Sequence, residues 1–202
     1  MTEPTPLELI EGTLSGQGTQ RVPVVPLIGL FSSTVSGFPV RTLVRDSEKQ
    51  AKSQLLALDT FGYDGVFTCM DLTVEAEALG AEVVFDEGAF PYVKSHPVED
   101  LERVEDLSLP PIETTRISTF VDAARRLAEK LQETHLVSSY IIGPFTLAGH
   151  LLDAERLLEI SIEEQALAKE IVSHCEGILQ PVLDAYAEAG VHNIVILEPA
   201  AS

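Results

Sequence analysis

Residues 138–152 decide the fold, and they read Ser-Ser-Tyr-Ile-Ile-Gly-Pro-Phe-Thr-Leu-Ala-Gly-His-Leu-Leu. The continuous apolar run Tyr-Ile-Ile is typical of a strand buried on both faces, as in a parallel sheet covered by helices. Gly143 allows a sharp turn, and Pro144 suits the first turn of the helix that follows. Residues just past such a strand lie at the carboxyl end of the sheet, where α/β folds place their active sites. Thr146 and His150, four positions apart on one helix face, are therefore candidates to face a pocket.

Strand-like and helix-like segments alternate along the whole chain. Main strands are predicted near Val24, Val66, Ile141 and Val195, at residues 22–30, 65–70, 136–142 and 193–197, with a small extra strand at 82–85. Helices are predicted at 7–14, 46–60, 74–79, 114–133, 145–152, 154–161 and 162–188. Pro181 should kink or split the last of these helices. This alternation implies parallel strands joined by right-handed crossovers, and hence an α/β fold.

Proline and polar residues mark the segments where this rhythm is weakest. Pro23 and Pro26 remove donors from a strand ladder, so the first strand is expected to be short. A loop rich in Ser and Gly is expected at 31–39. Residues 90–111 are acidic and contain several prolines, so we expect irregular structure there with one helical turn at 98–104.

Composition predicts one globular domain over residues 1–202. With 45% hydrophobic residues the chain can bury a sizeable core, and no apolar run is long enough to span a membrane. The first residues lack the pattern of a signal peptide, and two cysteines are too few for a disulfide framework, so a cytoplasmic location is expected. The net charge of -19 argues against nucleic-acid or anionic-membrane partners.

Five stretches carry a resemblance to a known family. They are Arg-Val-Pro-Val at 21–24, Phe-Gly-Tyr-Asp-Gly at 61–65, Asp-Leu-Thr-Val-Glu-Ala-Glu-Ala-Leu-Gly-Ala-Glu-Val at 71–83, Gly-Pro-Phe-Thr-Leu-Ala-Gly-His-Leu-Leu at 143–152 and Leu-Glu-Pro-Ala-Ala-Ser at 197–202. In order and spacing they resemble the uroporphyrinogen decarboxylase superfamily. The resemblance is closer to the branch of methylcobamide:coenzyme M methyltransferases than to the decarboxylases. It implies a (β/α)8 TIM barrel.

Four main strands make only half of such a barrel, which typically takes about 250 residues. The chain is therefore predicted to be the N-terminal half of a barrel, with the outer edges of its first and fourth strands unpaired. Unpaired edges are a liability in an isolated sheet. We expect a fragment of a longer protein; the alternatives are a partner chain that supplies a second half, or an open sheet.

Three polar residues are expected at the carboxyl rim of the sheet. Asp71 follows the second strand, and the resemblance places it where the decarboxylases have the aspartate that binds the ring nitrogens of the tetrapyrrole. The alternative for Asp71 is a helix cap. His150 falls where the decarboxylases have a pocket tyrosine, and it could donate a hydrogen bond or carry a proton, or lie on a helix flank. Glu198 ends the fourth strand, and a carboxylate there could transfer a proton.

The substrate is expected to contact residues around the same rim. Gly143, Phe145, Thr146 and Ser202 are the candidates, and Ser202 matches a serine of the methyltransferase branch. The decarboxylases carry an arginine-rich loop after their first strand that binds substrate carboxylates. Here residues 29–37 read Gly-Leu-Phe-Ser-Ser-Thr-Val-Ser-Gly and contain no arginine, which argues against uroporphyrinogen decarboxylation.

The resemblance also implies zinc and a methylated corrinoid. Methyltransferases of this branch bind zinc through a His-x-Cys pair and a later cysteine, all in the second half of the barrel, and no such motif occurs in this chain. His174 and Cys175 are adjacent within a predicted helix, and they are expected to be core or flank residues. No metal ligands are therefore assigned here.

These observations predict a corrinoid-dependent methyltransferase, with Asp71, His150 and Glu198 as its rim residues. Its partners would be a corrinoid protein, a small thiol such as coenzyme M, and a missing C-terminal half or second chain. Without zinc ligands this chain alone is expected to be inactive. The alternatives are a uroporphyrinogen decarboxylase-like enzyme of tetrapyrrole metabolism and a non-catalytic half-barrel binding module.

Overall fold

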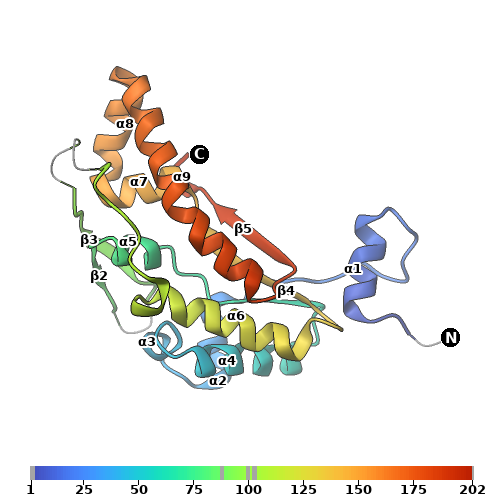
Figure 1. Cartoon of the computed structure of the whole chain (residues 1–202). Helices are drawn as coiled ribbons and strands as arrows, with labels where there is room; N and C mark the ends of the chain where they lie inside the picture. The colour runs from blue at the N-terminus through green and yellow to red at the C-terminus, as the bar shows by residue number, and fades with distance from the viewer. Residues whose placement is uncertain (1–2, 87–88, 99–100, 102–103, 202) are drawn as a thin grey trace. The chain divides into compact units, whose positions relative to one another are not determined.

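A computed structural model describes residues 3–86, 89–98, 101 and 104–201 (Figure 1). Its helices are α1 (Pro6–Leu14), α2 (Ser32–Ser36), α3 (Val40–Leu43), α4 (Ser47–Phe61), α5 (Val74–Ala78), α6 (Ile117–Leu131), α7 (Pro144–Leu152), α8 (Ala154–Glu163) and α9 (Gln165–Glu188). Its strands are β1 (Gly65–Phe67), β2 (Glu82–Val84), β3 (Tyr92–Ser95), β4 (Leu136–Ile142) and β5 (Asn193–Leu197). Short 3-10 helices lie at Gly29–Phe31, Ile112–Thr114 and Pro199–Ala201.

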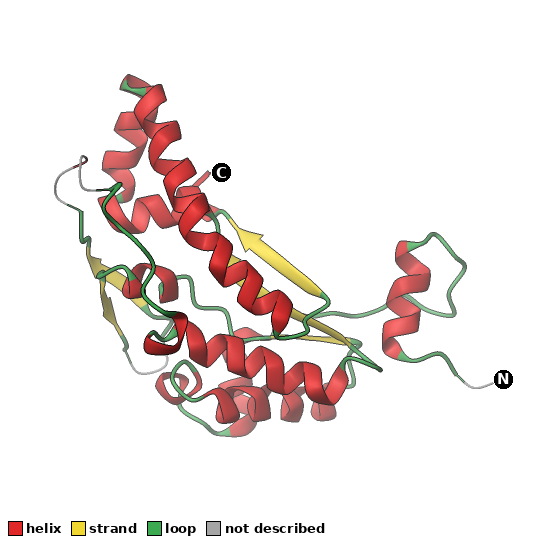
Figure 2. Ribbon diagram, viewed as in Figure 1, coloured by secondary structure: helices red, strands yellow, loops and turns green. Residues whose placement is uncertain are grey.

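The chain divides into two compact units. The first contains Met1–Met70, Thr119–Tyr140 and Ala185–Val195, and the second contains Asp71–Ser118, Ile141–Asp184 and Ile196–Ser202. Figure 2 shows that helices make up most of the regular structure around the few strands. The core of the first unit is formed by apolar residues of α4, β1, α6 and β4, namely Ala51, Ala57, Leu58, Tyr63, Val66, Leu127, Ala128, Leu131 and Val137.

The main sheet has the strand order β1-β4-β5. β1 and β4 are parallel, with Gly65 opposite Leu136 and Phe67 opposite Ser138. In β4 every residue after Leu136 is buried, as expected for a strand covered on both faces. β5 is only partly buried, in keeping with its place at one end of the strand order. The predicted α/β fold with parallel strands is therefore confirmed, and the predicted bounds of β4 and β5 are correct.

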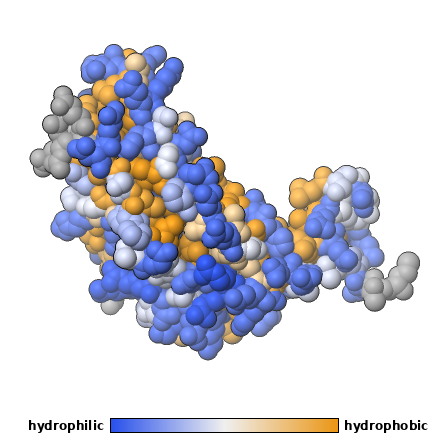
Figure 3. Space-filling view, in the orientation of Figure 1, coloured by the Kyte–Doolittle hydropathy of each residue, from blue (hydrophilic) through white to orange (hydrophobic). Residues whose placement is uncertain are grey.

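The predicted first strand is wrong, because residues 22–28 adopt no regular structure. Only Val24 bonds to the start of β1: its carbonyl accepts from the N–H of Asp64 at 2.7 Å, and its own N–H donates to Asp64 Oδ2 at 2.7 Å. Pro23 and Pro26 flank it and cannot donate, so no ladder extends from this point. The side chain of Leu27 is left 69% exposed. Figure 3 shows such apolar residues among the charged ones on the visible face.

Three other segments also differ from the prediction. Residues 31–39 contain the end of the 3-10 helix at Gly29–Phe31 and the helix α2 rather than only a loop. Ser32, the first residue of α2, is buried, and its hydroxyl lies 2.9 Å from that of Ser53 of α4. The second strand ends at Phe67 rather than at residue 70. One more hydrogen bond to β4 follows it, from the N–H of Thr68 to the carbonyl of Ser138. Residues 90–111 contain the strand β3, which pairs with β2 in an antiparallel hairpin. The helical turn predicted at 98–104 falls partly outside the described residues.

The helices agree more closely with their predictions. Asp46 caps α4 by accepting from the N–H of Lys49 at 3.0 Å, and Thr5 forms a capping box with Glu8 at the start of α1. The helix α9 continues through Pro181, so the predicted split is wrong, and the alternative of a kink stays a prediction. Because proline has no N–H, the carbonyl of Gly177, four residues earlier, lacks its usual helical donor. No helix in the described part of the chain is long and apolar enough to cross a membrane.

An ion pair at the amino end of β1 holds the irregular first segment. Both terminal nitrogens of Arg21 donate to the Asp64 carboxylate, with Nη1 2.6 Å from Oδ2, and the side chain of Asp64 is only 1% exposed. The hydrogen bonds from Arg21, helped by the N–H of Val24, lower the pKa of Asp64 below its usual value. This carboxylate therefore links the start of β1 to Arg21 and Val24, which lie between α1 and the 3-10 helix at Gly29–Phe31.

We expect Asp64→Ala to lower the free energy of unfolding by about 2–4 kcal/mol, because it leaves Arg21 and the N–H of Val24 without their acceptor. Urea denaturation measures this loss. The matched control is Asp59→Ala, at an exposed position of α4, which should change stability by less than about 0.5 kcal/mol.

The effect should also depend on pH. Because the pKa of Asp64 is lowered in the folded state, its contribution is present above the unfolded pKa of about 3.9 and is lost as pH falls through the folded value. The stability difference between wild type and Asp64→Ala should therefore shrink below about pH 4. A difference that stays constant down to pH 2 would contradict a charged Asp64.

Candidate functional site

Asp71 lies in a buried polar cluster of the second unit. Its side chain is 0% exposed; Oδ1 accepts from the N–H of Thr73 at 3.0 Å and from its hydroxyl at 2.7 Å. Oδ2 forms an ion pair with Nη1 of Arg116. Asp71 thus shapes the turn that leads into α5, although the residue directly before the helix is Thr73. Asp71 is therefore not the cap of α5, although it orders the turn before this helix. Its predicted role in a substrate pocket stays a prediction.

Arg116 is the cation at the centre of this cluster, and the sequence analysis missed it. It lies just before α6, and its side chain is only 9% exposed. Its three guanidinium nitrogens donate to different acceptors: Nε to Glu77 of α5, Nη1 to Asp71, and Nη2 to the Thr73 hydroxyl at 3.0 Å. The guanidinium also lies over the ring of Phe85, 4.9 Å from its centroid. No sequence signal marked Arg116, because its partners are 39 to 45 residues away.

Glu75 is a second residue that the sequence analysis did not single out. It lies on α5 and is 3% exposed, and its Oε2 has no hydrogen-bond partner among the described residues. Burial raises the pKa of its carboxyl to about 7; the Asp71 carboxylate adds to this rise, while the residue's own backbone N–H and Arg116 oppose it. In the sequence Glu75 was one of several acidic residues on a short helix.

His150 lies on α7, which packs against α5. Burial lowers the pKa of its imidazole, the nearby charge of His96 lowers it further, and a hydrogen bond with the backbone of Leu72 and the charge of Asp71 raise it. Its Nδ1 is buried without a partner among the described residues, and its carbonyl accepts from Nδ1 of His96 at 2.8 Å. The structure therefore brings His150 and Asp71 into the same electrostatic environment.

Glu198 caps the start of α7 with its carboxylate. Its Oε1 accepts from the N–H of Phe145 at 2.8 Å, and its Oε2 accepts from the N–H of Thr146 at 2.9 Å and from the Thr146 hydroxyl at 2.8 Å. These N–H groups belong to the free first turn of the helix, where a carboxylate is most favourable. Within the described residues Glu198 forms no hydrogen bond or ion pair with Asp71 or His150.

Gly143 explains how closely Glu198 approaches this helix. A Cβ atom at Gly143 would lie 2.1 Å from Cδ of Glu198, so the carboxylate occupies the space that a side chain would take. The N–H of Gly143 donates to the carbonyl of Leu197 at 2.7 Å. Thr146 is held here as well, since its hydroxyl accepts from the N–H of Ala200 at 3.2 Å. The junction after β4 and the segment after β5 are thus locked together.

Phe145, one of the predicted substrate-binding residues, borders a cavity. Together with Lys169 and Val172 of α9 it lines an open cavity of about 440 Å³. Thr146 is buried, and its hydroxyl donates to Glu198 Oε2. Ser202 lies outside the described residues.

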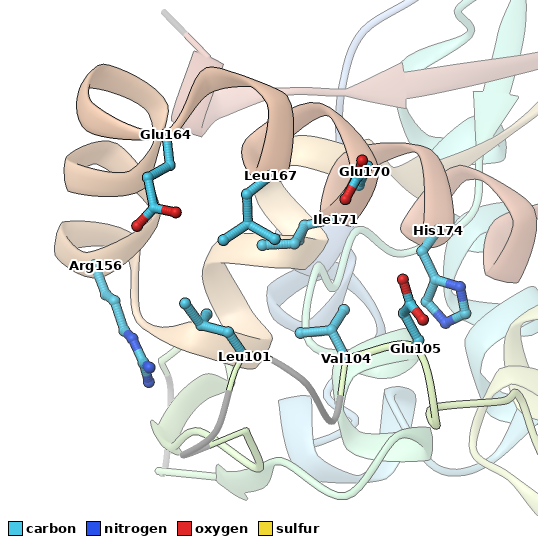
Figure 4. Close-up of a pocket in the computed structure, with 9 residues that line it drawn as sticks. All are labelled: Leu101, Val104, Glu105, Arg156, Glu164, Leu167, Glu170, Ile171 and His174. Carbon is cyan, nitrogen blue, oxygen red and sulfur yellow. The ribbon is translucent and has the colours of Figure 1, made fainter.

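A second cavity, of about 500 Å³, lies between α8, α9 and the residues Leu101, Val104 and Glu105 (Figure 4). Leu167 and Ile171 form part of its apolar wall, and Arg156 and Glu164 lie at one end. None of the three predicted rim residues lines it. His174, at the other end of the labelled group, contacts the Leu107 carbonyl with its Nε2 at 2.9 Å.

The neighbour of His174 in the chain is inaccessible. Cys175 is fully buried, and burial raises the pKa of its thiol to about 12, with a further contribution from Glu198. A thiol in this state is a poor nucleophile and a poor metal ligand. Across the residues that the structure describes, no group of three His, Cys, Asp or Glu side chains is arranged to hold a metal ion. The zinc implied by the resemblance therefore has no fitting ligands in the described part of this chain.

The profile of the family described as uroporphyrinogen decarboxylase (URO-D) matches residues 5–202. The chain belongs to the uroporphyrinogen decarboxylase family. The methylcobamide:CoM methyltransferase MtbA of Methanosarcina mazei is 29% identical over 100% of this chain and 60% of its own length. The uroporphyrinogen decarboxylase of Xanthomonas oryzae is 25% identical over 73% of this chain and 42% of its own length.

A solved methyltransferase structure from Methanosarcina mazei matches this member of the family with a TM-score of 0.87 and 26% identity, over 99% of this chain and 60% of that one. The predicted superfamily and its methyltransferase branch are thus confirmed, and so is a fold of the TIM-barrel family. The chain spans about 60% of the length of the methyltransferases that it matches.

Substitution of alanine for Gly143 and for Gly149 should change the stability of the protein in opposite directions. Gly143→Ala should lower the free energy of unfolding by about 1–3 kcal/mol, because the new Cβ must displace Glu198 from the start of α7. Gly149→Ala should raise it by about 0.5–1 kcal/mol, because its Cβ would meet Ala154 at an ordinary 3.6 Å and alanine favours a helix interior. Urea denaturation of both variants measures the two signs. Shifts of the same sign would contradict this account of Glu198.

Proposed function

We propose that this chain is part of a methyltransferase that moves a methyl group from a methylated corrinoid protein to a small thiol such as coenzyme M. The observation that carries the proposal is the extent of the matches. The methylcobamide:CoM methyltransferases match 100% of this chain, whereas the uroporphyrinogen decarboxylase of Xanthomonas oryzae matches 73% of it. The high TM-score to a solved methyltransferase supports the same choice.

The segment that contains α2 supports a methyltransferase over a decarboxylase. Residues 29–37 contain no arginine, and they are held by neutral hydrogen bonds: Nε2 of Gln54 donates to the carbonyl of Gly29 at 2.9 Å and to the hydroxyl of Ser32 at 3.1 Å. A substrate with many carboxylates would meet no guanidinium in this segment. A decarboxylase remains the second candidate, because the family includes decarboxylases that match most of the chain.

In the proposed reaction Asp71 and His150 are the candidate catalytic residues of this chain. The side chain of Asp71 is fixed as an acceptor by Arg116 and Thr73, so it supplies a stationary negative charge. His150 has a lowered pKa, so it is uncharged at neutral pH and can accept a proton or a hydrogen bond. Glu198 positions the start of α7. Zinc, which the resemblance implies, has no fitting ligands among the described residues of this chain.

The test is an assay of the full-length gene product with methylcobalamin and coenzyme M. We expect loss of the methyl group from methylcobalamin and formation of methyl-coenzyme M, measured by absorbance and mass spectrometry, with no decarboxylation of uroporphyrinogen. Asp71→Asn should lower kcat roughly tenfold or more, because it removes the fixed charge of the site. Asp59→Asn, at an exposed position of α4, is the control and should leave the rate unchanged.

The opposite pattern, decarboxylation without demethylation, would replace this proposal by its decarboxylase alternative. Neither activity in the full-length protein would favour a non-catalytic binding module. The size of that protein in solution then decides whether a second chain pairs with it.

A further inference from the structure

The cluster around Arg116 contains three carboxyl groups, but the guanidinium of Arg116 forms an ion pair with only two of them among the described residues. Asp71 and Glu77 each form an ion pair with Arg116, and the Thr73 hydroxyl accepts from its third nitrogen. Glu75 lies on the same helix as Glu77 and is 3% exposed, yet its Oε2 receives no hydrogen bond from the described residues. Three carboxylates therefore share the field of one guanidinium, and one of them is left with an unsatisfied buried oxygen.

This arrangement favours a proton on Glu75. With all three carboxyls ionised the cluster would carry three negative charges against the one positive charge of Arg116. The Glu77 side chain is 30% exposed, so water can stabilise it, but Asp71 and Glu75 are buried. A buried carboxylate without hydrogen bonds is very unfavourable, and such a group usually takes up a proton instead. Asp71 and Glu77 are stabilised as anions by direct contact with Arg116. Glu75, which interacts with Asp71 and Arg116 at longer range, is the group best placed to stay neutral.

The other titratable groups around the cluster come from α7 and from the end of β3. His150 interacts electrostatically with Asp71, and its Nδ1 is also buried without a partner among the described residues. His96 lies beyond it, bonded to the His150 carbonyl and 3.6 Å from Asp153. The pKa of His150 is lowered mainly by burial, so the imidazole adds no positive charge to the cluster at neutral pH. Arg116 is therefore the cation that balances the three carboxyls.

We propose that Glu75 is the group of this cluster that holds a proton in the folded protein and releases it as the pH rises, while Arg116 pairs with Asp71 and Glu77. The burial of Glu75 and its unpartnered Oε2 carry this proposal.

The electrostatics of the cluster agree with this assignment. Burial and the Asp71 charge raise the pKa of Glu75 to about 7, whereas an ordinary glutamate has a pKa of about 4.3. Two neighbouring carboxyls with separated proton affinities are a common basis for acid and base roles within one site.

The first experiment is a pH titration of the carboxyl carbons of ¹³C-labelled protein by NMR. We expect one carboxyl that titrates near pH 7 in the wild type, is absent in Glu75→Gln, and remains in the control Glu82→Gln, whose glutamate lies on β2 and pairs with Lys94. Glu77→Gln should shift that titration to lower pH, since it removes a carboxylate that partly neutralises Arg116. Titration of every carboxyl below about pH 5 would overturn the proposal.

A stability measurement guards against a variant that simply misfolds. Because the pKa of Glu75 is raised in the folded state, the folded protein holds this proton between about pH 4.3 and its folded pKa, and stability falls as pH rises through that window. Glu75→Gln cannot ionise, so its melting temperature relative to wild type should increase from pH 5 to pH 8. A relative melting temperature that does not change with pH would also count against a neutral Glu75.

Discussion

The burial of β4 is the constraint on which the rest of the structure depends. Every residue of this strand after Leu136 is buried, and it lies between β1 and β5 in the sheet. A strand with no exposed face needs apolar residues along its length, and its chain can leave only at its ends. At the carboxyl end Gly143 and Pro144 turn the chain into α7. The position of His150 on that helix follows from this turn.

The second constraint is the stabilisation of buried carboxylates in the second unit. The protein carries a net charge of -19, so buried carboxylates must share few cations. Arg116 donates to Asp71 and to Glu77 through separate nitrogens. Glu198 instead accepts hydrogen bonds from backbone N–H groups of α7. Glu75 has neither kind of support for its Oε2. The four acids thus differ in the donors available to them rather than in residue type.

Sequence patterns predicted the parts of this fold that depend on neighbours in the chain. The bounds of β4 and β5, the cap of α4 and the start of α7 all depend on runs of a few residues, and these predictions are confirmed. The prediction of a short first strand failed, although Pro23 and Pro26 were already known to lack donors. These two prolines prevent a ladder altogether rather than only shortening it. The cluster around Arg116 could not be predicted, since Asp71 and Arg116 are 45 residues apart and no local pattern joins them.

The predicted rim residues show the same limit of sequence patterns. A pattern shows which residues follow a strand, but it does not show which of them have polar atoms without a hydrogen-bond partner. Asp71 and Glu198 both follow strands, but their oxygens are already occupied by hydrogen bonds within the chain. A group whose bonds are all satisfied can hold a structure or supply a fixed charge, but it has little capacity left for a ligand or a proton. His150 and Glu75 retain unpartnered buried atoms among the described residues. Free hydrogen-bonding capacity, rather than position at the carboxyl end of a strand, therefore identifies the groups of this chain that are open to chemistry.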